Sequence, residues 1–225
     1  MDAVTTDEGR KYHTPEGIDL PSITTVLSIL SRDSIAKWRK RVGEVEANKI
    51  STRAANRGTA VHTVCEKYLD NDADYLDGVM PNNIETFQKI RPILDENVNN
   101  IHAQEAPLYS TYLGVAGRVD CVAEWQGKLS IIDFKTSRKE RNDDWNESYY
   151  IQASAYAEMF EERTGIEINQ IVILVVTEDG IVQEFVKTKG EYIPKLIEAI
   201  DDFTTDWEKE NEMVHSSSDD VTHKS

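Results

Sequence analysis

Two carboxylates and one amine stand at a spacing that suits phosphodiester chemistry. The segment Ile131–Ser137 predicts a short buried strand that carries Asp133 and Lys135. Because side chains alternate across a strand, these two point to one face and Phe134 points to the other. A second carboxylate, Asp120, lies near the start of another apolar segment. Two acids and a lysine brought together can hold a divalent cation and activate water, although an Asp-x-Lys strand alone is more simply an exposed ion pair.

A helical segment earlier in the chain offers a further ligand. His62 and Glu66 are four residues apart, so they share one helical face. A neutral imidazole is a metal ligand, and Glu66 would hold a water or a second ion. The alternative for His62 is an ordinary core histidine.

The two aspartates come from neighbouring predicted strands joined by a tight turn, so we expect them to meet across the sheet. Their oxygen atoms suit Mg²⁺ or Mn²⁺, and the carbonyl of Phe134 would add a ligand. Lys135 would then contact the attacking water or a phosphate oxygen and stabilise negative charge there.

Two further sets of residues give weaker evidence of function. Gln152 and Tyr156 share one face of a predicted helix and would contact phosphate, sugar or the lysine, unless they belong to a plain helix surface. Glu105 precedes the first predicted core strand. An exposed charge explains Glu105 more simply than a supporting acid does.

Composition excludes several classes of protein. The chain has 225 residues, 39% hydrophobic and 29% charged, which is typical of a globular protein. No apolar run approaches a membrane span, no secretory leader is expected, and no glycine-rich phosphate loop of an ATPase or kinase appears. Cys65 and Cys121 read as buried thiols in a reducing cytosol, too few for a cysteine zinc site or a four-cysteine iron–sulfur cluster.

The net charge of −16 is unevenly distributed. The stretch from Glu191 to Asp220 is strongly acidic, whereas basic residues form three clusters elsewhere. The first cluster is Lys37, Arg39, Lys40 and Arg41, the second is Lys49, Arg53 and Arg57, and the third is Arg138, Lys139 and Arg141. The last cluster directly follows the Asp-x-Lys strand. Local binding of nucleic acid is compatible with this distribution, and solvated helix faces are the alternative.

The order of predicted elements indicates an α/β fold with a central mixed β-sheet flanked by helices. We expect a helical N-terminal region over 1–100 that contributes one motif, a core over 101–210 and a disordered acidic, polar tail over 211–225, in a single structural domain. Predicted helices cover 22–69 with breaks, 84–98, 149–163 and 192–207, and predicted strands cover 106–112, 119–125, 129–134, 171–176 and 181–186.

Four ordered motifs carry a family resemblance. They are Gly58-Thr59-Ala60-Val61-His62, Gly117-Arg118-Val119-Asp120, Asp133-Phe134-Lys135-Thr136 and Gln152-Ala153-Ser154-Ala155-Tyr156. This set resembles the RecB-like branch of the PD-(D/E)XK nuclease superfamily, although Val119 replaces the proline of the family's name. The segment Leu20–Leu27, with Trp38 and Arg41-Val42-Gly43, resembles mitochondrial genome maintenance exonucleases and related phage exonucleases. The likeness spans roughly residues 12 to 160.

The resemblance implies a restriction-endonuclease-like core and assigns site roles. The implied metal ligands are His62, Asp120, Asp133 and the Phe134 carbonyl. The implied catalytic residues are Asp120, Asp133 and Lys135. The implied auxiliary residues are Glu66, Gln152 and Tyr156. Expected DNA contacts are Lys37, Arg41, Arg57, Thr136, Ser137, Arg138 and Lys139.

We therefore expect an exonuclease that depends on Mg²⁺ or Mn²⁺ and acts on DNA, at ends and on single strands. Recombination or replication proteins are expected partners, no membrane is involved, and the expected setting is the cytoplasm of a phage-infected or bacterial cell. A catalytically silent module that binds DNA ends is the first alternative. A sugar hydrolase with Asp120 and Asp133 as an acid/base pair is the second, and it leaves Lys135 without a task.

Overall fold

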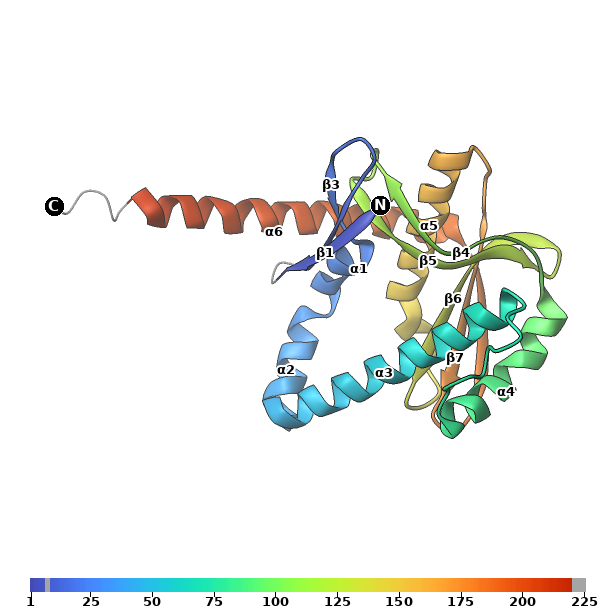
Figure 1. The fold of residues 1–225 in the computed structure, drawn as a ribbon. Helices are drawn as coiled ribbons and strands as arrows, with labels where there is room; N and C mark the ends of the chain where they lie inside the picture. The colour runs from blue at the N-terminus through green and yellow to red at the C-terminus, as the bar shows by residue number, and fades with distance from the viewer. Residues whose placement is uncertain (7–8, 220–225) are drawn as a thin grey trace.

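A five-stranded mixed sheet forms the centre of the protein (Figure 1). The computed structural model describes residues 1–6 and 9–219. The strand order is β4-β5-β6-β7-β8. Their bounds are Val98–Ser110 (β4), Val115–Trp125 (β5), Lys128–Ser137 (β6), Gln170–Thr177 (β7) and Val182–Thr188 (β8). The predicted fold class, a central mixed sheet flanked by helices, is confirmed.

Strands β4, β5 and β6 form an antiparallel meander, and β6 pairs with β7 in parallel. Gln126 and Gly127 make the two-residue turn from β5 to β6, with φ of 52° and 77°. Positive φ at both central positions is the geometry of a type I′ turn, which matches the twist of the hairpin. A parallel pair needs a crossover, which the helix α5 (Glu147–Thr164) supplies, and α5 ends at Gly165 with φ of 72°.

The two faces of the sheet are covered by different helices. One face packs on α5, on α1 (Ile23–Leu27) and on the start of α6 (Ile193–Asp219), through a core that includes Ile131 and Ile173. The other face packs on α3 (Glu44–Leu69) and α4 (Pro81–Asn97), through a core that includes Trp125 and Phe134. Strand β7 is buried on both faces, as its continuous apolar run predicts.

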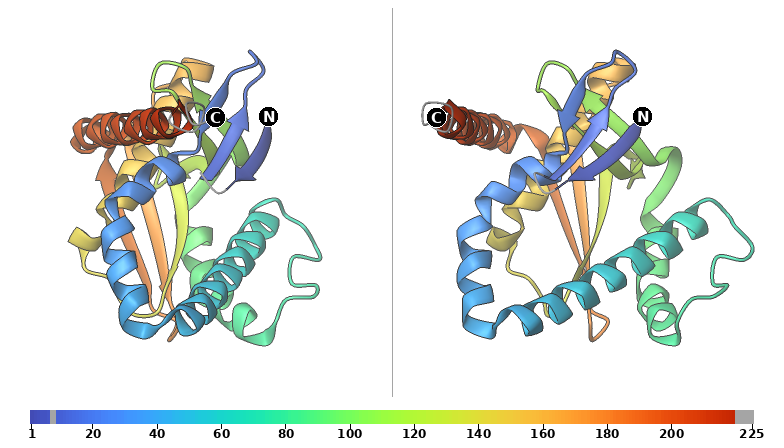
Figure 2. Two further views of the ribbon diagram at one scale, coloured as in Figure 1. Left: turned by 90° about the vertical axis from the view of Figure 1, so that its left-hand side faces the viewer. Right: turned by 60° about the vertical axis from the view of Figure 1, so that its left-hand side comes forward.

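The N-terminal helices form an arch beside the sheet. Helix α1 begins as predicted, because the hydroxyl of Ser22 accepts the backbone N–H of Thr25 at 3.0 Å. A short 3₁₀ turn, Ser28–Leu30, leads to α2 (Arg32–Val42), which meets α3 at Gly43 with φ of 86°. Helix α2 buries none of its residues, and it stands away from the sheet, connected to it through α1 and α3 (Figure 2). Further 3₁₀ turns are Asp143–Asn146 and Lys189–Glu191.

The segment Tyr12–Ile18 predicts two short extended pieces around a proline–glycine turn, and the region before α1 is indeed extended and not helical. Three short strands, β1 (Asp2–Thr6), β2 (Gly9–His13) and β3 (Asp19–Pro21), form a separate antiparallel sheet. All five residues of β1 are exposed, so no alternation of apolar and polar residues marks it as a strand.

The C-terminal helix is also longer than predicted. Helix α6 continues to Asp219 and extends away from the sheet, where the sequence predicted an unstructured tail from residue 211 (Figure 1). No proline or glycine lies between Pro194 and Asp219, so no helix-breaking residue interrupts this stretch. The predicted tail over 220–225 lies outside the described residues. Within the residues described, no helix combines the length and apolar character of a membrane span.

Candidate active site

The candidate site lies where β5 and β6 separate. Their pairing runs from Trp125 opposite Lys128 as far as Cys121 opposite Ile132. Beyond that point residues 115–119 of β5 pair with β4, with a single bridge from Ala116 to Ser22, while β6 continues along β7 to Ser137. Asp120 and Asp133 are the next residue of each strand, so they face each other at the fork, as the spacing and the tight turn predict.

The fork leaves the N–H and the carbonyl of Phe134 without a backbone partner in β5, although Phe134 still pairs with Leu174 of β7. Its N–H donates to the Oδ2 atom of Asp120 at 2.8 Å, and its carbonyl oxygen accepts from Nε2 of His62 at 2.5 Å. His62 is on α3, which crosses the sheet here, and its ring meets the Phe134 ring edge-on. Nδ1 of His62 lies 3.4 Å from Oδ2 of Asp120. The structure thus brings His62, Asp120 and the Phe134 carbonyl together.

Asp133 and Lys135 share the opposite face of β6, as strand alternation predicts. Nζ of Lys135 lies 2.6 Å from Oδ2 of Asp133. The ring of Tyr149 on α5 lies under the same ammonium, 5.1 Å away, and also 4.9 Å from the guanidinium of Arg141. Cations above an aromatic face are attracted to it, so Tyr149 helps to position Lys135. Sequence reasoning missed Tyr149, because only the fold places α5 beside this lysine.

Glu105 belongs to the site, and its description as an exposed charge is wrong. Its carboxylate lies 3.9 Å from Nδ1 of His62 and is largely buried. Glu105 has φ of 44° within β4, a conformation that side chains other than glycine rarely adopt. Arg118 spans the bend, because it donates to the Glu105 carbonyl at 3.0 Å and lies 3.9 Å from its carboxylate. This local turn of the backbone directs Glu105 toward His62.

The charges of the site depend on one another. Burial disfavours a charged His62, but Asp120 and Glu105 outweigh burial and raise the pKa of His62 to about 10. Burial also opposes ionisation of Asp120, and His62 and Lys135 outweigh it and lower the pKa of that carboxyl. Burial raises the pKa of Asp133 to about 6, against the attraction of Lys135.

The donor set fits a divalent cation. His62, Glu105 and Asp120 each present one ligand atom, and these atoms lie within 4.8 Å of one another. The Oδ1 atom of Asp133 is buried without a hydrogen bond inside the described part of the chain. A buried carboxylate oxygen without a partner is costly unless a cation or proton satisfies it. Carboxylate and carbonyl oxygens are ligands of hard divalent cations, and imidazole is a common ligand of divalent metals in proteins. The predicted auxiliary residue Glu66 is not part of this three-residue set.

The predicted auxiliary pair belongs to the core and not to a helix surface. Gln152 and Tyr156 are both buried, and Nε2 of Gln152 donates to the Tyr156 hydroxyl at 3.0 Å. A Cβ added to Gly117 would lie 2.6 Å from the Tyr156 ring. The glycine of one motif therefore makes room for the tyrosine of another, and this contact packs α5 against β5 near Asp120.

The predicted DNA contacts differ in their surroundings. Arg57 donates to the Ser137 carbonyl at 2.9 Å and to the Thr177 carbonyl at 2.5 Å, so it fixes the ends of β6 and β7. Thr136 lies beside Gly58 of α3, and the Ser137 hydroxyl donates to the Lys139 carbonyl at 2.7 Å. The remaining predicted contacts are exposed, on α2 and in the loop after β6, and they are Lys37, Arg41, Arg138 and Lys139.

Comparison with known proteins is consistent with this geometry. Mitochondrial genome maintenance exonuclease 1 of Mus musculus is 27% identical over 130 residues, and its Homo sapiens counterpart is 28% identical over 137 residues. Each match covers 54% of this chain and 38% of the relative, so the chain matches well under half the length of these curated proteins. The Xenopus tropicalis protein is 30% identical over 87 residues, which are 37% of this chain and 25% of that protein.

A crystal structure of a candidate exonuclease from Eubacterium rectale aligns with a TM-score of 0.46 and 13% identity, over 64% of this chain and 63% of that one. The profile of the PD-(D/E)XK nuclease superfamily matches residues 83–219, more than half of the chain, and this span contains Glu105, Asp120, Asp133 and Lys135. The matched residues include both strands of the fork, β5 and β6, and the chain therefore belongs to the PD-(D/E)XK nuclease superfamily.

Proposed function

We propose that this chain is a divalent-cation-dependent deoxyribonuclease that removes nucleotides from ends of single-stranded DNA. The observation that carries the proposal is the fork, where donors from α3, β4, β5 and β6 gather beside a partly buried lysine. The exonuclease activity named for the mitochondrial relatives supports the choice of an end-directed reaction.

The residues have separate tasks in this proposal. His62, Asp120, Asp133 and the Phe134 carbonyl hold the cation, with Glu105 as an additional carboxylate. When bound, Mg²⁺ or Mn²⁺ supplies Lewis acidity and makes water more acidic. Lys135 places its ammonium beside the scissile phosphate and stabilises the charge that develops on the phosphate oxygens. Asp133 and the Tyr149 ring hold that ammonium in place.

The arch formed by α2 and α3 gives a single DNA strand a route to the fork. Lys37, Lys40 and Arg41 are exposed on α2, where nothing is buried, and Arg39 is tied to Glu44 at the start of α3. Phosphate contacts of this kind give affinity without sequence preference. We therefore infer that α2 contacts the DNA backbone.

Labelled oligonucleotides test the reaction. Single-stranded and duplex DNA, each blocked at the 5′ or the 3′ end, are incubated with Mg²⁺, Mn²⁺ or EDTA. We expect products of stepwise shortening from one free end of single strands, with either cation and not with EDTA. The variants Asp133→Asn and Lys135→Met are expected to lower the rate by at least a factor of about 100, since the first weakens the hold on the cation and the second removes the ammonium that stabilises the reacting phosphate.

The control is Lys128→Gln, a surface lysine on the turn between β5 and β6, which should cleave like the unchanged protein. Full activity of either site variant would refute the assignment of the site. Retention of DNA without any cation-dependent product would instead support the silent end-binding module. We further propose that the protein works in the cytoplasm of a phage-infected or bacterial cell and that its partners are recombination or replication proteins. Co-purification from the source cells would test for these partners.

A further inference from the structure

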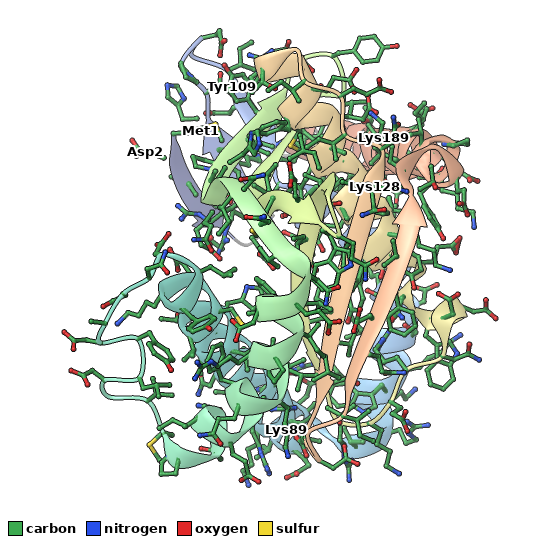
Figure 3. All side chains as sticks on the ribbon, turned by 90° about the vertical axis from the view of Figure 1, so that its right-hand side faces the viewer. Met1, Asp2, Lys89, Tyr109, Lys128 and Lys189 are labelled. Atoms are coloured by element: carbon green, nitrogen blue, oxygen red, sulfur yellow. The ribbon has the colours of Figure 1, made fainter. Side chains whose placement is uncertain are left out.

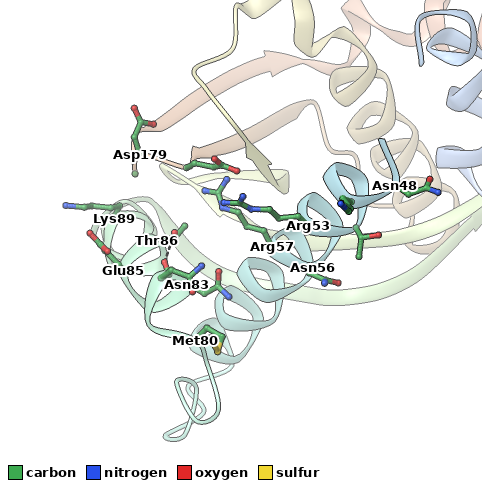
Figure 4. Close-up of a pocket in the computed structure, with 15 residues that line it drawn as sticks. Asn48, Arg53, Asn56, Arg57, Met80, Asn83, Glu85, Thr86, Lys89 and Asp179 are labelled. Carbon is green, nitrogen blue, oxygen red and sulfur yellow. Dashed lines mark hydrogen bonds between the residues drawn. The ribbon is translucent and has the colours of Figure 1, made fainter. Parts of the chain in front are cut away.

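A polar groove of about 980 Å³ lies beside the candidate active site and is not part of it (Figure 4). Its walls are the first half of α3, the start of α4 and the turn between β7 and β8. Its cationic side chains are Lys49, Arg53, Arg57 and Lys89, and its acidic ones are Glu85, Glu178 and Asp179. The groove is thus slightly cationic in a chain whose net charge is −16.

The groove is built on fixed backbone. Arg57 ties α3 to the Ser137 and Thr177 carbonyls, which sets the distance between the helix and the strand ends. On the opposite side the stem of Lys89 packs against Gly180, since a Cβ added there would lie 3.4 Å from Cγ of Lys89. Such a groove exists before a ligand arrives, so little ordering is needed to fill it.

The position of the groove connects it to the chemistry. Arg57 precedes His62 by five residues on the same helix, which is about 8 Å along the helix axis. Ser137 ends the strand that carries Asp133 and Lys135. A DNA strand that leaves the fork along the end of β6 therefore reaches the groove within a short distance.

The side chains of the groove indicate what it binds. Arg53 and Arg57 extend from α3 across the groove, and Asn83 faces them from α4 (Figure 4). Several amides accompany the cations, and no aromatic residue is among the lining residues. Cations and amides contact phosphate and sugar, whereas stacking on bases needs aromatic rings.

We propose that this groove binds the backbone of the single DNA strand next to the scissile phosphate, with Lys49 and Arg53 as phosphate contacts and Lys89 at the rim. This inference rests on the proposed function and adds a second contact surface, on the other side of α3 from the exposed cations of α2. It requires binding that does not depend on base sequence.

The test compares two double variants with equal changes of charge. Lys49→Gln/Arg53→Gln removes the two contacts, and Lys67→Gln/Lys128→Gln removes two cations that do not line the groove. Lys128 lies at the opposite end of the sheet from Lys89 (Figure 3). Binding of a labelled single-stranded oligonucleotide of mixed sequence is measured by fluorescence anisotropy in EDTA at several salt concentrations, and thermal melting checks that each variant folds.

For the groove variant we expect about tenfold weaker binding. We also expect the slope of log K against log salt concentration to be smaller in magnitude by about 1.4, because each of the two lost phosphate contacts lowers that slope by about 0.7. The control variant should keep most of the affinity. An unchanged slope in the groove variant, or an equal loss in the control, would overturn the proposal. Absence of cation-dependent cleavage by the unchanged protein would instead refute the proposed function and leave the binding result to be judged separately.

Discussion

Two motif glycines, Gly117 and Gly58, have opposite physical roles. A Cβ on Gly117 would overlap the Tyr156 ring and approach Ile23 to 3.2 Å, whereas a Cβ on Gly58 would meet only Thr136, at 3.7 Å. We expect Gly117→Ala to lower stability by about 1–3 kcal/mol through overpacking. Gly58→Ala should raise it by about 0.5–1 kcal/mol, because alanine favours the helix. Chemical denaturation measures both, and equal effects of the two substitutions would contradict this account.

At the residue scale the sequence predicts the pairs that depend on regular geometry. Asp120 and Asp133 meet because a hairpin brings consecutive strands together, and Asp133 and Lys135 share a face because strands alternate. Glu105 could not be found in this way, since it reaches His62 only through its positive φ. Gln152 and Tyr156 were predicted as a pair, but the glycine that accommodates the tyrosine is distant in sequence and gave no sign of their burial.

At the scale of elements, α2 is held by few buried contacts. It buries none of its residues, whereas β7 is buried along nearly its whole length. We therefore expect backbone amides of α2 to exchange with solvent at least about 100-fold faster than those of β7, because local opening of α2 exposes little apolar surface. Hydrogen–deuterium exchange with mass spectrometry measures this difference.

The same experiment tests the function of the arch. Single-stranded DNA added in EDTA should slow exchange in α2 and leave β7 unchanged. Slow exchange of α2 without DNA, or no response of α2 to DNA, would show that this helix is not a mobile contact for the strand.

Elements with strong internal patterns were predictable, and elements fixed by tertiary contacts were not. Strand β7, the turn at Gln126 and the C-cap at Gly165 each have a local signal, namely a continuous apolar run or a glycine at the required position. Strand β1 has no such signal, because it is defined only by its pairing with β2. The start of β4 was also missed, since polar residues precede its buried part.

At the scale of the whole molecule, the site concentrates charge that a cation would neutralise. Glu105 and Asp120 meet beside His62, the buried carboxylate of Asp133 lies close enough to repel that of Asp120, and the Oδ1 atom of Asp133 has no hydrogen bond in the described structure. We expect Mn²⁺ at about 100 times its Kd to stabilise the folded state by about 2.7 kcal/mol, which raises Tm by about 5–10 °C. Differential scanning fluorimetry against an EDTA baseline measures the shift.

Two carboxylate variants make this measurement specific. Asp120→Asn should abolish the shift, because it removes a charged donor from the fork. Glu66→Gln is the matched control, one helical turn from His62 and outside the three-residue donor set, so it should keep the shift. A shift that survives in Asp120→Asn would place the cation elsewhere.

The parallel pairing of β6 with β7 also orders events during synthesis. Ser130–Ser137 of β6 pairs with Gln170–Thr177, and the part of β6 that carries Asp133 and Lys135 lies beyond its pairing with β5, so this part gains its strand partner only after residue 177 has left the ribosome. Domains fold as units during translation, and an unfinished chain lacks the partner that aligns these two side chains. We therefore expect a polypeptide still being translated to contain every side chain of the fork, with Asp133 and Lys135 not yet aligned until β7 is complete.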